Sequence, residues 1–409
     1  MKIHVQYRFH PVGQGLFSAG RLTLGSSFNH HSRPDFQWVY DCGTSSSQRL
    51  VRNALGKFQS RADGRRLDLV VISHFDADHI SGMVKLLNDV GTRTLMLPWA
   101  PLWHRLAIGY AQGLEPDDPE FAFYTDPAQY LVDQAGDGFN QIVFVPFSDG
   151  DGPADPDGGG EPDFDPDGDL PLKIEAEAEI RQEKGDQDWM AEWMSYLSGA
   201  RHHYQMLMMH PRGTAFIPSL WEFVPYNDPT TRPQNVARFV ERVNDLRDAL
   251  LNSSDNDRKD ALRELKDHYV RTFPKSQLND LSLFLYGGPI GHWRTNWPWF
   301  EEKFDGSVIY TGDGNLSTDH QWQSLVGYLG HKRSFQPTVF QVPHHGSKNN
   351  WFTGLASMIE PGLSIFSSDP GHRSFGHPHA DVLRDLWPFR PVQVDKVNHY
   401  WAHFELHRD

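Results

Sequence analysis

Residues 67–82 read LDLVVISHFDADHISG. The first six are mostly apolar and rich in β-branched side chains, which predicts a buried strand. His74, Asp76, Asp78 and His79 follow within six positions, where this strand would end. Neighbouring carboxylates repel each other unless a cation neutralises them. The stretch therefore predicts a metal site at the carboxyl end of a strand, followed by a helix near 83–90.

Strand-like segments continue on both sides of this stretch. In the first 99 residues they lie near 5–9, 37–40 and 94–98, with a helix expected over 48–58. From residue 278 onward they lie near 281–286, 307–311, 338–342 and 363–367, with helices expected over 319–329 and 381–386. Two β-rich halves with helices between them predict an α/β protein in which two stacked sheets are covered by helices.

Residues 100–277 interrupt this rhythm, and we expect them to form a large insertion. The segment begins with many aromatic residues, and helical spacing recurs over 183–197, 233–251 and 259–273. Residues 149–171 contain eight Asp, one Glu and no Lys or Arg, among many Gly and Pro. This composition is typical of a loop or a disordered segment.

The bulk composition narrows the class of protein. The 409 residues are 38% hydrophobic, which suffices for a packed core, and no apolar run reaches membrane-spanning length. The N-terminal residues lack the apolar block of a signal peptide, and the single Cys42 fits a reducing compartment. We therefore expect a cytoplasmic protein that is not associated with a membrane. The net charge of -15 argues against a chain-wide nucleic-acid surface, but the 149–171 tract carries more than half of it.

Further Asp and His residues follow the strands of the C-terminal half. Asp313 comes after strand 307–311 and a Gly, and His344 and His345 come after strand 338–342. His377 and His379 follow strand 363–367. Since strand ends meet at one edge of a layered α/β fold, these side chains predict a metal centre between the two sheets.

Taken together, these motifs resemble the metallo-β-lactamase fold superfamily. The resemblance rests on VGQG at 12–15, DCG at 41–43, HFDADH at 74–79, TGD at 311–313 and HHGS at 344–347. With GHP at 376–378, the set most resembles the hydrolase domain of the competence DNA-uptake channel and its free-standing relatives. Phosphorylcholine esterase is similar in having Asp in the metal motif. The resemblance covers about 1–100 and 278–405, and implies an αββα sandwich of two mixed β-sheets with the insertion added.

The resemblance also implies roles for individual residues. His74 and Asp76 would hold one divalent ion, and Asp78 and His79 the other. Asp313 would bridge both ions, and His344 would complete the ligand shell of the second ion. Asp78, His345 and His377 would act in catalysis. His345 and His377, with His379 as a further candidate, would contact the substrate or the leaving group.

Two departures from the superfamily pattern bear on the metal. His is commoner at the position of Asp76, and a further His between the motif and the bridging Asp has no counterpart here; Asn279 and Ser282 occupy that stretch. The first site would therefore be rich in oxygen ligands. Manganese becomes a rival to zinc, because carboxylate and water ligands suit it.

These expectations combine into a metal-dependent hydrolase, most simply a phosphodiesterase or nuclease that uses a metal-bound hydroxide. The alternatives are a hydrolase of small esters or phosphoesters, and a conditional component of a multi-protein assembly such as those of anti-phage defence. The corresponding partners would be nucleic acid, a small phosphoester, or a protein docked through residues 100–277.

Overall fold

The computed structural model describes most of the chain in atomic detail. The described ranges are 1–25, 35–61, 64–111, 113–148, 150–154, 170–176, 204–228, 237–246, 249–250, 254–272, 282–295 and 304–408. The acidic tract at 149–171, apart from 150–154 and its last two residues, and the helix expected over 183–197 lie outside these ranges.

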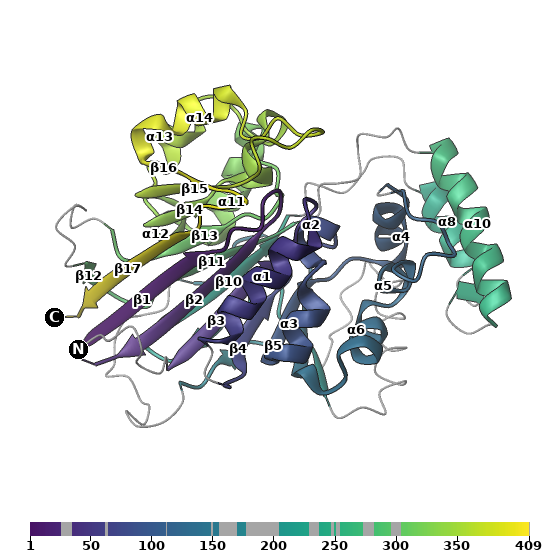
Figure 1. Cartoon of the computed structure of the whole chain (residues 1–409), viewed down its shortest axis with the longest axis horizontal. Helices are drawn as coiled ribbons and strands as arrows, with labels where there is room; N and C mark the ends of the chain where they lie inside the picture. The colour runs from purple at the N-terminus through teal and green to yellow at the C-terminus, as the bar shows by residue number, and fades with distance from the viewer. Residues whose placement is uncertain are drawn as a thin grey trace.

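Two β-sheets organise the described chain (Figure 1). The first sheet has antiparallel strands at one side and parallel strands at the other, with β3 between the two kinds of pairing. In spatial order its strands are β12 (Arg294–Thr295), β17 (Tyr400–His407), β1 (Lys2–Phe9), β2 (Phe17–Leu24), β3 (Phe36–Cys42), β4 (Leu67–Val71), β5 (Thr92–Pro98), β6 (Phe139–Val145) and β8 (Gln205–Met208).

The second sheet is also mixed, with parallel pairing from β16 to β13 and antiparallel pairing beyond. In spatial order its strands are β16 (Pro391–Val394), β15 (Leu363–Ser367), β14 (Val339–Gln341), β13 (Val308–Tyr310), β11 (Leu283–Pro289), β10 (Trp221–Asn227), β9 (Ala215–Ile217) and β7 (Lys173–Ile174). The parallel strands of the two sheets supply the ends at which the Asp and His motifs lie.

The main core lies between the two sheets. Trp38 of β3 packs against Trp221 and Phe223 of β10, with ring centroids 6.2 and 5.3 Å apart. Tyr40 of β3 stacks on Tyr310 of β13 at 4.5 Å. Strands whose side chains are buried on both faces need a helix layer outside each sheet.

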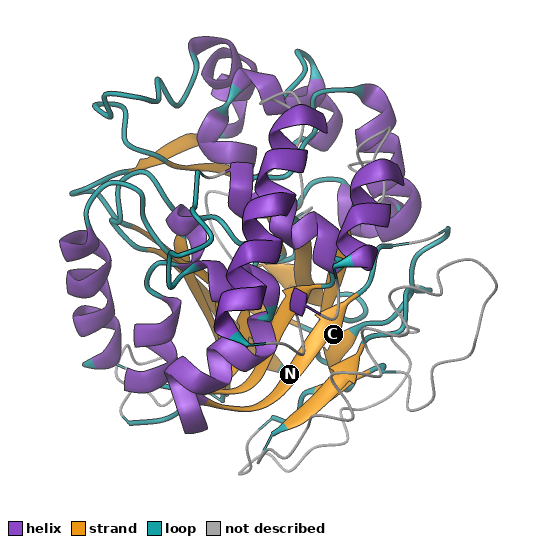
Figure 2. Ribbon diagram, turned by 90° about the vertical axis from the view of Figure 1, so that its right-hand side faces the viewer, coloured by secondary structure: helices purple, strands orange, loops and turns teal. Residues whose placement is uncertain are grey.

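Helices cover the outer faces of both sheets. Figure 2 shows helices in front of the strands. Helix α1 (Gln48–Gln59) buries Val51, Ala54, Leu55 and Phe58, a spacing that places one apolar stripe against the first sheet. Helices α3 (Met83–Asp89), α5 (Phe121–Thr125) and α6 (Pro127–Ala135) pack beside it. Helices α11 (Asp319–Leu329), α13 (Leu355–Ile359) and α14 (Ala380–Leu386) cover the second sheet. This is the αββα sandwich of two mixed sheets, and the predicted fold class is confirmed.

The region 100–277 contains more strand than its sequence suggested. β6 and β8 extend the first sheet, while β10, β9 and β7 extend the second. Among the described helices of the region, α4 (Leu102–Ala111), α8 (Ala237–Asp245) and α10 (Asp255–Thr272) share an apolar cluster of their own. Figure 1 shows α8 and α10 side by side at the edge of the molecule. The expected helices therefore exist at 237–245 and 255–272, but five strands inside the region were not anticipated.

The two ends of the chain meet at one edge of the first sheet. Lys2 of β1 pairs with His407 of β17, and the Met1 ammonium donates to the Arg408 carbonyl at 3.3 Å. The termini therefore lie side by side near the edge of the first sheet that ends in β12 (Figure 1). Among the described helices, none is both long and apolar enough to cross a membrane.

Candidate metal centre

The predicted metal motif lies at the carboxyl end of β4 and in the short helix α2 (Ala77–Ile80). The backbone of this helix rests on two neighbouring turns. The Leu16 N–H donates to the Asp78 carbonyl at 3.1 Å, and the Gly82 N–H donates to the Cys42 carbonyl at 2.8 Å. A Cβ on Gly43 would lie 2.5 Å from the backbone of His79, so only glycine fits there. The VGQG and DCG motifs thus form the seat of α2.

Asp41, the last residue but one of β3, orients both histidines of the motif. Its carboxylate accepts from the Ser73 N–H at 2.7 Å and from the Ser73 hydroxyl at 2.6 Å, and lies 2.7 Å from Nδ1 of His79. The Ser73 hydroxyl oxygen lies 2.8 Å from Nδ1 of His74. With Nδ1–H of each ring held in this way, Nε2 of both rings is directed at the centre, where it can bind a cation once it carries no proton.

Asp313 enters the centre on a tight turn after β13. Gly312 has φ of +53°, and a Cβ there would collide with the hydroxyls of Ser282 and Ser73. The side chain of Gln341, from β14, holds this turn: its oxygen accepts from the N–H groups of Thr311 and Gly312 at 2.8 Å. Its amide nitrogen donates to the Gly312 carbonyl at 3.2 Å. Gln341 therefore fixes the position of the Asp313 carboxylate.

His344 and His345 both adopt left-handed backbone conformations, with φ of 46° and 58°. Side chains rarely tolerate this region, and such strain concentrates at functional sites. Nδ1 of the buried His345 lies 2.6 Å from the Ser367 carbonyl, which accepts its proton. Nε2 of His345 then faces Asp78 Oδ2 at 3.2 Å and Asp313 Oδ1 at 3.4 Å. His344 is more exposed, and its Nε2 lies 3.6 Å from Asp313 Oδ2.

The donor atoms of His74, Asp78, His79 and Asp313 all lie within 4.8 Å of one another. Nε2 of His74, Nε2 of His79 and Oδ1 of Asp313 are buried without hydrogen-bond partners, although Nε2 of His79 is 3.0 Å from Asp313 Oδ1. Buried polar atoms are normally paired, and an unpaired convergent set is what an ion satisfies. Two imidazoles and two carboxylates are suitable ligands for zinc or manganese. The residues present therefore fit a divalent metal.

The electrostatics of the centre agree with this reading. Burial would lower the pKa of His79, but the Asp313 and Asp41 carboxylates hold it well above its usual range. Burial would raise the pKa of Asp313, but His344, His79 and His345 hold it well below its usual range. Burial next to His79 lowers the pKa of His74 to about 3, so this ring is neutral and can act as a ligand. The excess of carboxylate is what a divalent cation would neutralise.

The structure places the residues of the two departures from the superfamily pattern differently. Asp76 is the half-buried N-cap residue of α2. It does not belong to the four residues whose donor atoms converge in the described structure. Ser282 is buried; its hydroxyl accepts from the Asp313 N–H at 3.2 Å and donates to the Thr311 carbonyl at 3.2 Å. Ser282 thus supports the turn of Asp313. Asn279 lies outside the described residues.

His377 is brought to the centre from the opposite side. Its ring centroid is 5.7 Å from that of His344 and 6.2 Å from that of His345. The side-chain amide of Gln14 lies 3.3 Å from Nδ1 of His377, and burial beside His345 lowers the pKa of His377 to about 4. His379 is the N-cap of α14 and accepts from the Lys348 N–H at 3.2 Å, which makes it a helix-start residue.

Basic residues near the sequence motifs divide into structural and exposed groups. Arg333 is buried and pairs with Glu222 at 2.8 Å, so it is part of the core. Arg384 pairs with Asp381 at 3.0 Å. Lys348 and Arg373 are exposed, and within the described ranges neither side chain makes an ion pair or a hydrogen bond. Trp351, which could have stacked on a base, is 7% exposed and belongs to the core around α13.

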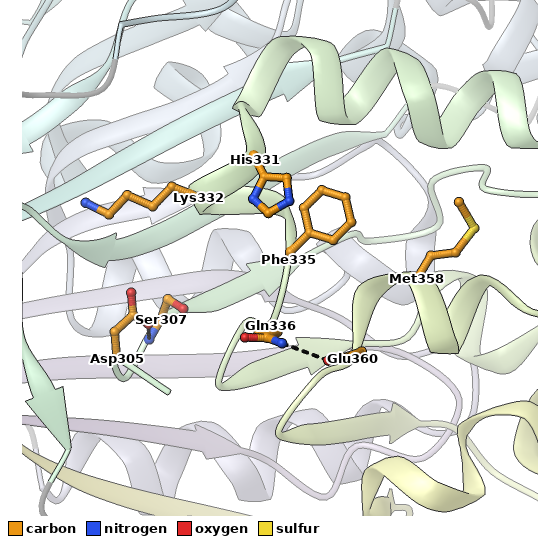
Figure 3. Close-up of a pocket in the computed structure, with 8 residues that line it drawn as sticks. All are labelled: Asp305, Ser307, His331, Lys332, Phe335, Gln336, Met358 and Glu360. Carbon is orange, nitrogen blue, oxygen red and sulfur yellow. Dashed lines mark hydrogen bonds between the residues drawn. The ribbon is translucent and has the colours of Figure 1, made fainter. Parts of the chain in front are cut away.

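A separate cavity of about 450 Å³ lies away from the metal motif (Figure 3). Asp305 and Ser307, which precede β13, line it together with His331 and Phe335 near α12 (His331–Ser334). The Gln336 side chain donates to Glu360 across it at 2.7 Å. Asp305 and Ser307 lie at the start of β13, whereas Asp313 lies beyond its end, so this cavity is not part of the metal centre.

Three residues that position the side chains of the centre were not predicted from the sequence to do so: Asp41, Gln341 and Gln14. Asp41 stands directly after an apolar run, which is the same signal that marks His74 and Asp313. Gln341 lies inside a strand and Gln14 in a turn, so neither had a local signal. Their roles depend on which strand lies beside which, and this is set by the tertiary structure.

Comparisons with known proteins agree with the fold. The sequence model of the "Metallo-beta-lactamase superfamily" matches residues 37–155, a segment that runs from β3 past β6 and contains the metal motif. No curated protein matches the chain. Among solved structures, the chain is similar to the metallo-beta-lactamase fold protein YhfI from Bacillus subtilis, with 9% identity, a TM-score of 0.37, and coverage of 97% of this chain and 99% of that one. Residues 37–155 therefore carry the sequence signature of that superfamily, within the αββα sandwich described above.

Proposed function

We propose that this protein is a dinuclear metal-dependent phosphodiesterase that acts on nucleic acid or nucleotides. The superfamily signature indicates a metal-dependent hydrolase, and the His and Asp cluster is consistent with it. The observation that carries the proposal is the convergence of three buried, unpartnered donor atoms, on His74, His79 and Asp313, at the ends of two sheets. The two imidazoles are held through Nδ1, and Asp313 is held through its backbone N–H, so the donors are positioned before an ion binds.

In this proposal His74, Asp76 and Asp313 would hold one ion. Asp78, His79 and Asp313 would hold the second. We infer that His345, in place of His344, would complete the ligand shell of the second ion. Nε2 of His345 faces Asp78 and Asp313, while its Nδ1 donates to the Ser367 carbonyl. The oxygen-rich donor set keeps manganese and zinc as the two candidate metals.

When bound, two divalent ions lower the pKa of a water molecule and stabilise negative charge on a phosphoryl oxygen. The chain's own residues supply the remaining functions. Gln14 donates to Nδ1 of His377, which leaves the proton of this neutral ring on Nε2. His377 can therefore donate a hydrogen bond to a non-bridging or departing oxygen of the substrate.

Exposed charge supports an anionic substrate. Lys348 and Arg373 lie in the loops that carry His345 and His377, and their side chains are exposed and unpaired within the described chain. Cations at the mouth of a hydrolytic site favour an anionic substrate. A phosphodiester keeps its charge throughout hydrolysis, whereas a neutral ester or a lactone gives these side chains no partner before the reaction.

The test is metal-dependent cleavage. Protein stripped with a chelator and reloaded with Mn²⁺ or Zn²⁺ is incubated with single- and double-stranded DNA and RNA, and with bis(p-nitrophenyl) phosphate. We expect the ions to restore cleavage of at least one nucleic acid and the Asp313→Ala variant to lose it by a factor of about 100 or more. Asp305→Ala is the matched control, since Asp305 lies before the start of β13, whereas the metal centre lies beyond its end.

The main alternative, a hydrolase of small neutral esters, is separated by a parallel assay with p-nitrophenyl acetate. Hydrolysis of the ester with no cleavage of any phosphodiester under either metal would overturn the proposal. Equal cleavage by wild type and Asp313→Ala would overturn it as well. The remaining alternative, a component of a larger assembly, gains weight if the metal-loaded protein cleaves nothing.

A further inference from the structure

The two halves of the metal motif are held by different parts of the chain. Asp78 and His79 lie in α2, which rests on the VGQG and DCG turns. Phe75 and Asp76 lie in the segment between β4 and α2. This segment contacts α5, where the hydroxyl of Tyr124 donates to the Phe75 carbonyl at 2.7 Å. A helix that carries no predicted ligand therefore reaches into the metal motif.

The contact between α5 and Phe75 is buried. Phe75 is 1% exposed and Tyr124 is 3% exposed, and the ring of Phe123 packs edge-on against the Phe75 ring at 5.1 Å. Among the described residues no backbone N–H donates to the Phe75 carbonyl, so the Tyr124 hydroxyl is its donor. A buried carbonyl that loses its donor is destabilised. The hydroxyl thus stabilises the present orientation of this peptide unit.

This peptide unit decides where the side chain of Asp76 points. The Phe75 carbonyl belongs to the unit that precedes Asp76, and a peptide unit is planar, so holding its carbonyl limits rotation on the amino side of the Asp76 Cα. On the other side, the Asp76 carbonyl accepts from the N–H groups of His79 and Ile80 at 2.9 and 3.1 Å. Both peptide units that flank Asp76 are therefore held, and with them the direction of its Cα–Cβ bond.

Tyr124 is itself fixed by α4. The buried guanidinium of Arg105 donates to the Tyr124 carbonyl through Nε and to the Thr125 carbonyl through Nη2, both at 3.0 Å. Gly109 brings the two helices together, because a Cβ there would lie only 3.1 Å from the Tyr124 ring. The hydroxyl is therefore delivered to the motif from a rigid, well-packed part of the chain.

We propose that Tyr124 is a positioning residue for the first ion, the one assigned above to Asp76. It holds the Phe75 carbonyl and thereby keeps the Asp76 carboxylate where rotation of its own side chain brings it to the ion. Asp76 stands between His74 and Asp78 in the chain, and both of these belong to the converging donors. This role rests on the proposed function, since it assumes two ions, but it does not depend on the substrate. The second ion, held from α2, should not depend on Tyr124.

The test is metal binding by the full-length protein after chelator treatment, which needs no substrate. Mn²⁺ is titrated into wild type, Tyr124→Phe and Asp76→Ala, and the free Mn²⁺ is measured by electron paramagnetic resonance. The binding step that Asp76→Ala weakens identifies the first ion. We expect Tyr124→Phe to weaken this step about 10-fold, a typical loss when a residue that orients a ligand is removed, and to leave the other step unchanged.

Tyr110→Phe is the matched control. The Tyr110 hydroxyl is also buried and also donates to a backbone carbonyl at 2.7 Å, but its acceptor is Leu262 of α10. Tyr110 and Tyr124 both pack against the ring of Phe121. We expect Tyr110→Phe to leave both binding steps unchanged. Equal weakening of the first step by Tyr110→Phe and Tyr124→Phe would show a general loosening of this cluster and would overturn the proposal.

Combining the substitutions distinguishes positioning from a merely structural role. If Tyr124 acts through Asp76, Tyr124→Phe should cause no further loss of affinity in a protein that already carries Asp76→Ala. Losses that multiply would overturn the proposal, as would a Tyr124→Phe variant that binds both ions like wild type or binds both more weakly.

The same titration separates this proposal from the proposed function. Two Mn²⁺ steps with the expected response to Tyr124→Phe, but no cleavage of any phosphodiester, would support the positioning role and contradict the phosphodiesterase. Cleavage by a wild type whose Mn²⁺ binding does not respond to Asp76→Ala or Tyr124→Phe would overturn the positioning role alone.

Discussion

Asp41 positions His79 and, through Ser73, His74, so it couples both histidines to one carboxylate. Asp41 is fully buried and has φ of +57°, a backbone region that Asn and Asp tolerate better than other side chains. An Asp41→Asn substitution therefore preserves the backbone and the size of the side chain. It removes only the charge and one acceptor.

We expect Asp41→Asn to weaken metal binding by a factor of about 10 to 100, the usual effect of losing a residue that orients a ligand. The Asn side chain has one acceptor oxygen, which cannot accept from both Ser73 and Nδ1 of His79. The His79 ring therefore loses its defined tautomer. Competition with a fluorescent chelator measures the affinity, and far-UV circular dichroism checks the fold. Asp305→Asn is the control for loss of an acidic group elsewhere. Unchanged affinity in Asp41→Asn would show that Asp41 does not orient the ligands.

The residues of the metal centre differ in how well the sequence predicts their positions. His74, Asp78, His79 and Asp313 follow apolar runs that predict buried strands, so their position and their chemistry indicate the same site. His344 and His345 are adjacent, and their local sequence does not say which one faces inward. The left-handed turn at both residues decides this, and it turns His345 to Asp78. That turn follows from packing against Gly312 and Ser367, which no local pattern reports.

At the scale of elements, α2 depends on glycine more than on its own sequence. The helix has only four residues, too few for stability without outside support. That support comes from the backbone of Gly43, which lies against His79, and from Leu16, which donates to Asp78. The ligands Asp78 and His79 are therefore fixed by two turns that carry no ligand themselves.

Replacing Gly43 by Ala should destabilise the protein by about 1–3 kcal/mol, as overpacking of a tight contact does. The new Cβ would be 2.5 Å from the His79 backbone, so α2 must shift and metal affinity should fall as well. Gly56→Ala in the exposed part of α1 is the matched control, since a Cβ there meets nothing within 4 Å. It should stabilise the protein by about 0.5–1 kcal/mol. Urea unfolding of both variants measures the difference, and equal midpoints would refute the tight contact.

The strands within 100–277 show what element patterns cannot tell. β10 reads WEFVPYN, and a Pro inside such a run argues against a strand with partners on both sides. β9 pairs only with Trp221–Phe223, so Pro225 has a strand neighbour on the β11 side alone. β6 reads FNQIVFV, which is strand-like, but its place beside β5 depends on the helices α4 to α6 that connect them. Helix content and sheet membership in one segment are separate questions, and only the first is local.

At the scale of the whole molecule, His10 links the stability of the sandwich to pH. The ring lies at the junction of β1, β2 and α1, stacked on Phe17 at 4.1 Å and edge-on to Phe58 at 5.8 Å. Nε2 of His10 is buried without a hydrogen-bond partner in the described structure. Burial, with smaller contributions from His399 and Lys57, lowers the pKa of His10 to about 3. The folded protein therefore keeps this imidazole neutral.

The sign of the pH effect follows from linkage. In the unfolded chain His10 takes up a proton near its ordinary pKa of about 6.5, but in the fold it does so only near pH 3. Between these values the unfolded state binds one more proton, so stability falls as the pH falls, by at most about 1.4 kcal/mol per pH unit. Above about pH 6.5 the contribution is complete.

We expect the His10→Phe variant to lose this contribution while keeping the stack on Phe17. The unfolding free energies of wild type and variant are measured in urea from pH 7.5 down to pH 5. As the pH falls, the unfolding free energy of the wild type should decrease relative to that of the variant, because only the unfolded wild type takes up a proton at position 10. The other histidines cancel in this comparison, including those of the metal centre if both proteins are stripped of metal. Replacing the exposed His320 by Phe is the control. Parallel pH curves for wild type and His10→Phe would show that the fold accommodates a protonated His10, and that burial at this junction does not set the acid limit of the sandwich.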